Sequence, residues 1–250
     1  MRTLTLLVSL LVAFSLGAPC CGFAPTASAG GSSLQAPTRL TAADQPAPQY
    51  RPRSYRPPKA RIEGGTRGQD STMPMVIPLV PDHVGLTIVT QPDLYWYLSK
   101  PTLSPVMFVL LDARSVQVIT RVTLTPPFQP GVQLLRVKDF GISLERDVQY
   151  RWFVNVVLDP NAPSRDLVAG GMIQRIVPEF AASDLPSTSN LAAVRFYAEA
   201  GLWYDAIAAI SNLISAAPTD HLLRKQRASL LTQVGLREVA EWDLREAGRP

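Results

Sequence analysis

The run from Asp147 to Leu158 constrains the fold more than any other stretch, because every second residue in it is apolar. The six alternating apolar side chains are those of Val148, Tyr150, Trp152, Val154, Val156 and Leu158. Successive side chains of a β-strand point to opposite faces, so this spacing predicts a long central strand with one buried face. Polar residues interrupt the other face, which is therefore at least partly in contact with water. Trp152 is expected to be a core residue.

Leu144, Asp147 and Tyr150 stand at the spacing Leu-x-x-Asp-x-x-Tyr. This spacing resembles the tyrosine corner of immunoglobulin-like and fibronectin-like sandwiches, in which the tyrosine hydroxyl bonds to the backbone a few residues upstream. Beyond Met73, short apolar segments alternate with turn residues, which is typical of an all-β domain. An immunoglobulin/fibronectin-like sandwich is predicted over residues 73–180, with seven strands at 85–89, 94–98, 106–111, 116–124, 132–137, 148–158 and 167–177.

From Leu191 onward the apolar spacing changes from two residues to about 3.6, which predicts helices. Gly201 and Gly235 are separated by the tetratricopeptide period of about 34 residues. Residues 187–250 are therefore expected to form two tetratricopeptide-like helix pairs, which makes the chain α+β overall. Because a free-standing array needs about three repeats, the helices are expected to pack against the sandwich.

The second helix pair departs from the repeat pattern at Arg224 and Arg227, which stand where the pattern has apolar residues. In such repeats the first helix of each pair lines a concave surface, and a polar surface of this kind suits an extended or helical segment of another protein. The alternative is that the helices only cap the sandwich and that this face is solvated. The predicted partner-facing positions are Arg195, Glu199, Lys225, Ser229 and Gln233.

Residues 1–29 have the three parts of a secretory signal peptide: an early arginine, an apolar run from Leu4 to Leu16, and small residues ending at Ala29. A retained membrane anchor is less favoured, because a spanning helix needs about 20 apolar residues. Lipid attachment at Cys20 or Cys21 is the least favoured interpretation, because Pro19 stands where a small, unconstrained residue is expected before a lipidated cysteine. After cleavage, residues 30–250 contain no cysteine and no apolar segment long enough to span a membrane. The mature protein is therefore predicted to be exported and soluble, in the periplasm or outside the cell.

Residues 30–72 are rich in Pro, Ser, Ala and Gln and are predicted to form a disordered tether. They hold seven Lys/Arg against three Asp/Glu, whereas residues 73–250 hold 16 against 17. A nearly neutral folded region lacks the field that attracts nucleic acid, so nucleic acid is not an expected partner. The tether is interpreted either as a solvated linker or as a patch for an anionic envelope polymer or lipid head groups, formed by Arg51, Arg53, Arg56, Lys59 and Arg61.

His83 and His221 are the only histidines, and they fall in different predicted domains. Neither stands in a catalytic or metal-binding motif, and the predicted mature chain has no thiol. No catalytic residue, metal or cofactor is therefore predicted. A pocket that gathers carboxylates around His83 would favour an unrecognised hydrolase instead.

Tyr95, Trp96 and Tyr97 are consecutive, so in a strand Trp96 faces one side and the two tyrosines face the other. If Trp96 fills the core, Tyr95 and Tyr97 lie on the outer face of the sandwich. We expect these two rings to pack against the helices. If they stay exposed, they could stack on sugar, as in a carbohydrate-binding sandwich module.

Several short motifs along the chain resemble those of one bacterial family. They are Gly64-Gly-Thr-Arg-Gly68, Gly85-Leu-Thr87, Pro92 to Leu98 with its Tyr-Trp-Tyr, Tyr150-Arg-Trp152, Gly171-Met-Ile-Gln-Arg175 and Ala200-Gly-Leu-Trp-Tyr-Asp-Ala206. Together they cover about residues 59–240, and the chain is similar to the DUF928 family, mostly cyanobacterial exported domains of unknown function. Many members carry cysteines where this chain has Gln69 and Val157, so the resemblance implies no disulfide here. It implies fold and export, but no activity.

Three classes of function remain open after these observations. A non-catalytic exported cell-envelope interaction (adaptor) protein is favoured, because tetratricopeptide-like helices suit an envelope protein or peptide as partner. A carbohydrate-binding β-sandwich module and an unrecognised hydrolase are the alternatives. Coverage of Tyr95 and Tyr97 by the helices would argue against the carbohydrate platform.

Overall fold

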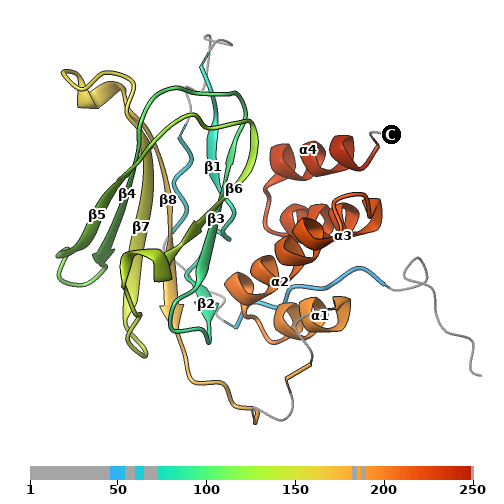
Figure 1. Ribbon diagram of the computed structural model, residues 1–250. Helices are drawn as coiled ribbons and strands as arrows, with labels where there is room; N and C mark the ends of the chain where they lie inside the picture. The colour runs from blue at the N-terminus through green and yellow to red at the C-terminus, as the bar shows by residue number, and fades with distance from the viewer. Residues whose placement is uncertain (1–45, 54–59, 65–72, 182–184, 187–189, 249–250) are drawn as a thin grey trace, which may run out of the picture. The chain divides into compact units, whose positions relative to one another are not determined.

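We describe the protein from a computed structural model, whose described residues form two β-sheets followed by four α-helices (Figure 1). The chain is therefore α+β with a sheet-rich N-terminal part, as the sequence predicts. The predicted signal segment, residues 1–29, lies outside the described part of the chain. The structure describes residues 46–53, 60–64, 73–181, 185–186 and 190–248.

The strands form one three-stranded and one five-stranded sheet. The smaller sheet is antiparallel with the order β1-β3-β6. Its strands are β1 (Val76–Pro78), β3 (Asp93–Leu98) and β6 (Gly131–Arg136). The larger sheet has the order β2-β8-β7-β4-β5, with β2 parallel to β8 and the other neighbours antiparallel. Its strands are β2 (Gly85–Thr87), β4 (Val106–Asp112), β5 (Val118–Leu124), β7 (Gln149–Val156) and β8 (Leu167–Arg175).

Each of the seven predicted strands corresponds to an observed strand, and only the ends differ. β5 begins two residues later than predicted, because Val116 has a φ of 57°, which belongs to the turn after β4. The sequence does not predict β1. This strand has three residues between Pro74 and Pro81, too few to show a period of two.

β7 lies between β4 and β8 and has the predicted alternation of buried and less buried residues. Trp152 is 0% exposed and lies opposite Leu110 of β4 and Gly171 of β8. The prediction that Trp152 is a core residue is confirmed. The buried side chains of this strand are Tyr150, Trp152, Val154 and Val156.

Tyr150 makes the hydrogen bond that its spacing from Leu144 predicts. Its hydroxyl accepts from the backbone N–H of Glu145 at 3.1 Å, and Leu144 is buried. Asp147, between them, has a φ of 59° and turns the chain into β7. The bond links the loop before β7 to the start of that strand, because Glu145 lies in the loop and Tyr150 is the second residue of β7.

The helices form two consecutive hairpins. The two helices of each hairpin are joined at Gly201 (φ 74°) and Gly235 (φ 78°), in a left-handed backbone conformation that glycine adopts without strain. Side-chain oxygens of Asn190 and Asp220 cap the first helix of each hairpin. No helix in the described residues is long and apolar enough to cross a membrane. The helices are α1 (Leu191–Glu199), α2 (Trp203–Ala216), α3 (His221–Gln233) and α4 (Arg237–Ala247).

Arg224 and Arg227 stand at positions where the repeat pattern has apolar residues, and Arg227 is buried there in an ion pair. Arg227 is 3% exposed and makes two 2.7 Å hydrogen bonds to the carboxylate of Asp243, which is 0% exposed. It also donates to the hydroxyl of Ser211 at 3.1 Å. The guanidinium of Arg224 lies 5.8 Å from the ring centre of Trp242. The second hairpin therefore packs through a bidentate pair, which satisfies the buried charge.

The first residues of α2, Trp203 and Tyr204, bond to residues in or next to the strands of the sheets. Tyr204 accepts a 2.8 Å hydrogen bond from the indole of Trp152 and donates one of 3.1 Å to the carbonyl of Met172. The indole of Trp203 donates to the carbonyl of Leu79 at 2.8 Å. A Cβ at Gly85 would lie 2.5 Å from the ring of Tyr204, so glycine allows this approach. The expectation that the helices pack on the sheets is confirmed.

Part of the predicted disordered tether, residues 30–72, is ordered. Ile62 pairs with Gly170 of β8, and Gly64 pairs with Val76 of β1, so residues 60–64 pair with one strand of each sheet. Residues 46–53 pack against the helices and are described below. The prediction is wrong for these two stretches, because their backbone groups find partners in distant elements and need no apolar core of their own. The rest of the predicted tether lies outside the described residues.

Candidate functional site

Residues 46–53, here called the docked segment, lie against α1 and α3 and contact two of the predicted partner-facing residues. Arg195 donates from Nε to the carbonyl oxygen of Pro46 at 3.1 Å. Gln233 donates from Nε2 to the carbonyl oxygen of Pro48 and accepts from the N–H of Tyr50, both at 2.8 Å. The face that the sequence predicts for a partner thus holds a segment of the same chain.

The docked segment also bonds to the end of α1. The N–H of Arg51 donates to the carbonyl of Ala198 at 3.0 Å, and Nε of Arg53 donates to the carbonyl of Ala200 at 2.8 Å. A Cβ on Gly201 would lie 2.7 Å from the carbonyl oxygen of Arg51, so this glycine allows both the turn after α1 and the close passage of the segment. We call the surface formed by Arg195, Ala198, Ala200 and Gln233 the helical groove.

Tyr50 is the side chain by which the docked segment enters the fold. Its ring stacks on His83 with 5.8 Å between ring centres, and it lies nearly perpendicular to the ring of Trp203 with 4.8 Å between ring centres. The Tyr50 hydroxyl and Nε2 of His83 are 2.8 Å apart and share a hydrogen bond. Burial raises the pKa of Tyr50, and burial lowers the pKa of His83 against the opposing charge of Asp82. Both shifts favour the neutral forms of the two groups.

The remaining predicted partner-facing residues flank the helical groove. Glu199 and Lys225 are exposed on α1 and α3, one helical turn from Arg195 and two turns from Gln233 respectively. Ser229 is half-buried, and its carbonyl accepts from the side chain of Gln233 at 3.2 Å. Whether an external partner uses these positions remains a prediction.

Of the basic residues predicted to bind an anionic polymer, the structure describes Arg51, Arg53 and Arg61. Arg61 is 9% exposed in its side chain and pairs with Glu63 at 2.8 Å and Asp82 at 3.2 Å. It also donates to the carbonyls of Val80 and Val234. The donors of Arg61 are thus used inside the fold, and binding of an anionic polymer stays a prediction. Arg51 and Arg53 are exposed, and Arg56 and Lys59 lie outside the described residues.

Tyr95 and Tyr97 are covered, with exposures of 5% and 4%. The ring of Tyr97 lies 5.7 Å from that of Trp242 on α4, and burial raises the pKa of Tyr97. The Tyr95 hydroxyl is buried without a hydrogen-bond partner among the described residues, and burial raises its pKa. Packing against the helices, the favoured expectation, is confirmed for Tyr97. Neither ring is accessible as a platform for sugar.

His83 and His221 are not brought together. Nε2 of His83 is bonded to Tyr50, and the carboxylate of Asp82 is paired with Arg61. His221 is exposed at the start of α3. Within the described residues, no group of three or more His, Cys, Asp or Glu side chains is placed to hold a metal ion. In this part of the chain, the carboxylate-lined pocket that would favour a hydrolase is not seen at His83.

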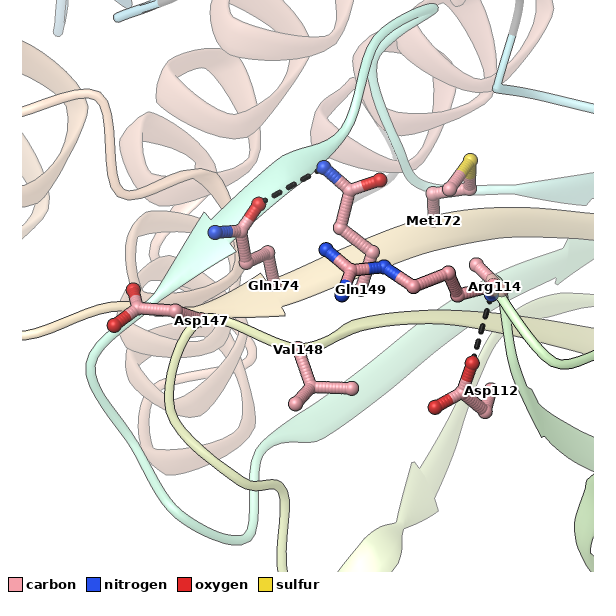
Figure 2. Close-up of a pocket in the computed structure, with 8 residues that line it drawn as sticks. Asp112, Arg114, Asp147, Val148, Gln149, Met172 and Gln174 are labelled. Atoms are coloured by element: carbon pink, nitrogen blue, oxygen red, sulfur yellow. Dashed lines mark hydrogen bonds between the residues drawn. The ribbon is translucent and has the colours of Figure 1, made fainter.

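A polar pocket of about 430 Å³ lies where β4 ends, β7 begins and β8 ends (Figure 2). Two amides face each other in it, with Nε2 of Gln149 donating to Oε1 of Gln174 at 3.1 Å. Asp112 accepts from the backbone N–H groups of Ser115 and Arg114, which hold its pKa below the usual range. The other lining residues include Asp147, Val148 and Met172. The sequence does not single out this pocket.

A second pocket of about 420 Å³ runs along α2 and is lined mainly by alanines and other apolar residues. Asp205 contributes an acidic side chain to its lining. Its carboxylate accepts from the N–H of Ile88 at 3.3 Å. Burial raises the pKa of Asp205 to about 7, against the hydrogen bonds from Thr87 and Ile88.

Sequence reasoning found the polar face of α1 and α3 but missed its occupant and the contact between Tyr50 and His83. The two bonded partners Pro48 and Gln233 are 185 residues apart. No local period connects such positions. One signal in the sequence points to the contact. Tyr50 is an aromatic residue in a proline-rich stretch, and aromatic residues are rare in solvated linkers.

Comparisons with known proteins identify a family but no activity. The family model described as Domain of Unknown Function (DUF928) matches residues 62–244. No curated protein matches the sequence. A solved structure that matches is a multi-domain immunophilin from Arabidopsis thaliana, with 9% identity over 77% of this chain and 99% of that chain. Its TM-score is 0.18, so it supports no inference about the fold. The match over residues 62–244 shows that the chain belongs to the DUF928 family.

Proposed function

We propose that the protein is a non-catalytic, exported cell-envelope interaction (adaptor) protein whose helical groove binds an extended segment of a partner protein. One observation carries the proposal: the groove already holds an extended segment, residues 46–53, through hydrogen bonds to its backbone. Export to the periplasm or the cell exterior follows from the signal-like residues 1–29.

The groove contacts support binding in preference to catalysis. Arg195, Gln233 and Ala198 meet backbone carbonyl and N–H groups of the docked segment, which any extended chain offers. Of the charged residues of the segment, Arg51 is exposed, and Arg53 also donates to a backbone carbonyl, that of Ala200. Backbone recognition with few side-chain pockets is typical of peptide-binding surfaces and gives modest affinity.

The finer fold assignments belong to the same proposal. Residues 73–180 are assigned to an immunoglobulin/fibronectin-like sandwich, supported by the Tyr150 hydrogen bond to Glu145. Residues 187–250 are assigned to two tetratricopeptide-like helix pairs, supported by the left-handed glycines at 201 and 235. In this assignment α1 and α3 are the first helices of the two pairs, and they are the helices that the docked segment contacts.

Cross-linking in native envelope extract tests the proposal. Lys225 is exposed on α3 and offers an amine for a cross-linker beside the groove. An Arg195→Glu, Gln233→Ala double variant should lose the proteins that wild type captures at Lys225, whereas Arg237→Gln, an exposed position on α4, should keep them. Proteins are identified by the peptide that is joined to Lys225. A captured set that is the same for all three proteins would contradict the proposal.

The carbohydrate-binding alternative is favoured by a different site, the polar pocket of Figure 2. Its amides and carboxylates are the planar polar groups that bond sugar hydroxyls, and Val148 and Met172 add an apolar surface. Titration with soluble envelope oligosaccharides, followed by NMR, tests it. Binding that is lost in Gln174→Ala supports this function, and the absence of shifts at Gln149 and Gln174 removes it.

A further inference from the structure

The docked segment shows which chemistry the helical groove selects. Four of its groups are held: the buried ring of Pro48, the ring of Tyr50, the backbone from residue 46 to residue 51, and the side chain of Arg53, whose Nε donates to the carbonyl of Ala200 at 2.8 Å. Arg51 is exposed, and the guanidinium of Arg53 adds an ion pair with Glu179 at 3.7 Å. Selectivity therefore comes from the proline, the tyrosine, the arginine at position 53 and the pattern of backbone bonds.

The backbone bonds distinguish positions where proline fits from positions where it does not. At Pro46 and Pro48 the groove bonds to the carbonyl oxygen, so the missing N–H of proline costs nothing there. At Tyr50 and Arg51 it bonds to the N–H, through Gln233 and Ala198 respectively. The groove therefore accepts proline two residues before the tyrosine and excludes it at the tyrosine and the next position.

The aromatic slot distinguishes tyrosine from other residues. His83 stacks on the Tyr50 ring, and the rings of Tyr50 and Trp203 are nearly perpendicular, with 4.8 Å between their centres. The hydroxyl is 2.8 Å from Nε2 of His83. Phenylalanine would fill the slot but leave this nitrogen without its partner, and a smaller side chain would leave Trp203 uncovered.

We propose that the partner of the helical groove is an extended Pro-x-Tyr segment of another envelope protein, and that the docked segment occupies the groove in cis until such a segment displaces it. This inference rests on the proposed function. Only six residues, 54–59, join the docked segment to Ala60, whose N–H is bonded to Asp82. A short connector of this kind gives an effective concentration on the order of mM.

The cis segment therefore outcompetes an identical segment from a second copy at ordinary protein concentrations. A separate partner needs contacts that the docked segment does not make. Glu199 and Lys225 offer them, because they lie on the groove-facing sides of α1 and α3 and are exposed. A partner segment with a basic residue near Glu199 and an acidic residue near Lys225 would gain two charge contacts.

A fluorescent peptide with the sequence of residues 46–53, Pro-Ala-Pro-Gln-Tyr-Arg-Pro-Arg, tests the inference by anisotropy. The Tyr50→Ala protein, whose own segment has lost its anchor, should bind this peptide at least about tenfold more tightly than wild type does. A peptide with phenylalanine for the tyrosine should bind about fivefold more weakly, and one with alanine should show no binding in the same range.

Matched second substitutions locate the binding. In the Tyr50→Ala background, Gln233→Ala removes the bonds to two backbone groups and should weaken peptide binding by about tenfold. Arg237→Gln in the same background, on exposed α4, should leave it unchanged. Circular dichroism and the thermal midpoint verify that each variant is folded.

Three results would overturn the inference. One is a folded Tyr50→Ala protein that binds none of the peptides, or binds the tyrosine and alanine peptides equally. Another is wild type that binds as tightly as Tyr50→Ala, because the groove would then not be occupied in cis. The third is a wild-type dimer that becomes a monomer in Tyr50→Ala, because the occupant would then be a second copy. In each case, the proposed function would still be supported if the Arg195→Glu, Gln233→Ala variant lost the proteins that wild type captures at Lys225.

Discussion

Asp205 is a carboxyl group held where its charged form is disfavoured. It lies in the first turn of α2, where the helix dipole favours a negative charge, and it accepts hydrogen bonds from Thr87 and Ile88. Burial outweighs these effects and raises its pKa from 3.8 to about 7. In the unfolded chain the same group ionises near its ordinary pKa.

The raised pKa of Asp205 predicts a loss of stability with increasing pH. Because the folded-state pKa of Asp205 lies above its unfolded value, protonated Asp205 stabilises the fold. This contribution is fully present below pH 3.8 and is lost as the pH rises through about 7. Asp205→Asn lacks this dependence. Between pH 4.5 and 7.5, the wild-type free energy of unfolding should fall relative to that of the variant, by on the order of 3 kcal/mol. Urea unfolding at the two pH values measures it, and parallel changes in both proteins would contradict the account.

Replacement of tyrosine by phenylalanine should have opposite effects on stability at Tyr204 and at Tyr95. The Tyr204 hydroxyl joins Trp152 to the carbonyl of Met172, so Tyr204→Phe leaves two buried groups unpaired and should cost about 1–3 kcal/mol. The Tyr95 hydroxyl is buried without a partner in the described part of the chain, so Tyr95→Phe should be neutral or stabilising. Denaturant unfolding of the two variants compares them. Equal destabilisation would show that the hydrogen bonds of Tyr204 do not matter.

At the scale of elements, the docked segment and the loop that holds His83 influence each other through burial. Tyr50 stacks on His83, and Trp203 of α2 lies behind Tyr50. Burial lowers the pKa of His83, while the facing charge of Asp82 opposes the shift. A depressed folded-state pKa means that docking is favoured above the ordinary histidine value, near 6.5, and weakens as the pH falls through it.

NMR titration of the His83 ring tests this coupling, and the chain has only two histidines to assign. The pKa of His83 should lie below 6.5 in wild type and should rise in Tyr50→Ala, because the docked ring no longer buries the imidazole. A pKa that is the same in both proteins would show that the docked segment does not cover His83.

Element prediction from sequence succeeded where a period was long enough to be recognised. The alternation through Trp152 predicted β7, and the change of spacing at Leu191 predicted helices. The packing of the second hairpin was not predictable, because the partner that makes Arg227 acceptable in a buried position is Asp243, 16 residues away on α4. Periodicity reports which face is apolar and does not report which buried charges will meet.

At the scale of the whole molecule, composition alone was misleading for residues 46–53 and 60–64. These stretches lack the apolar residues of a core, yet backbone pairing with Gly170 and Val76 and with α1 and α3 orders them. Much of this order depends on surfaces built by residues far along the chain, which no window of sequence contains. The candidate groove was half predicted: Arg195 and Gln233 were named from the repeat pattern, and the segment that fills it was not.

Amide hydrogen exchange of residues 46–53 in the intact protein is the most direct test of the central claim that the helical groove holds an extended segment. The N–H groups of Tyr50 and Arg51 are bonded to Gln233 and Ala198 and should exchange much more slowly than in the free peptide. Gln233→Ala should remove the protection of Tyr50, and Arg237→Gln should not. Exchange of both amides at the free-peptide rate in wild type would contradict the account.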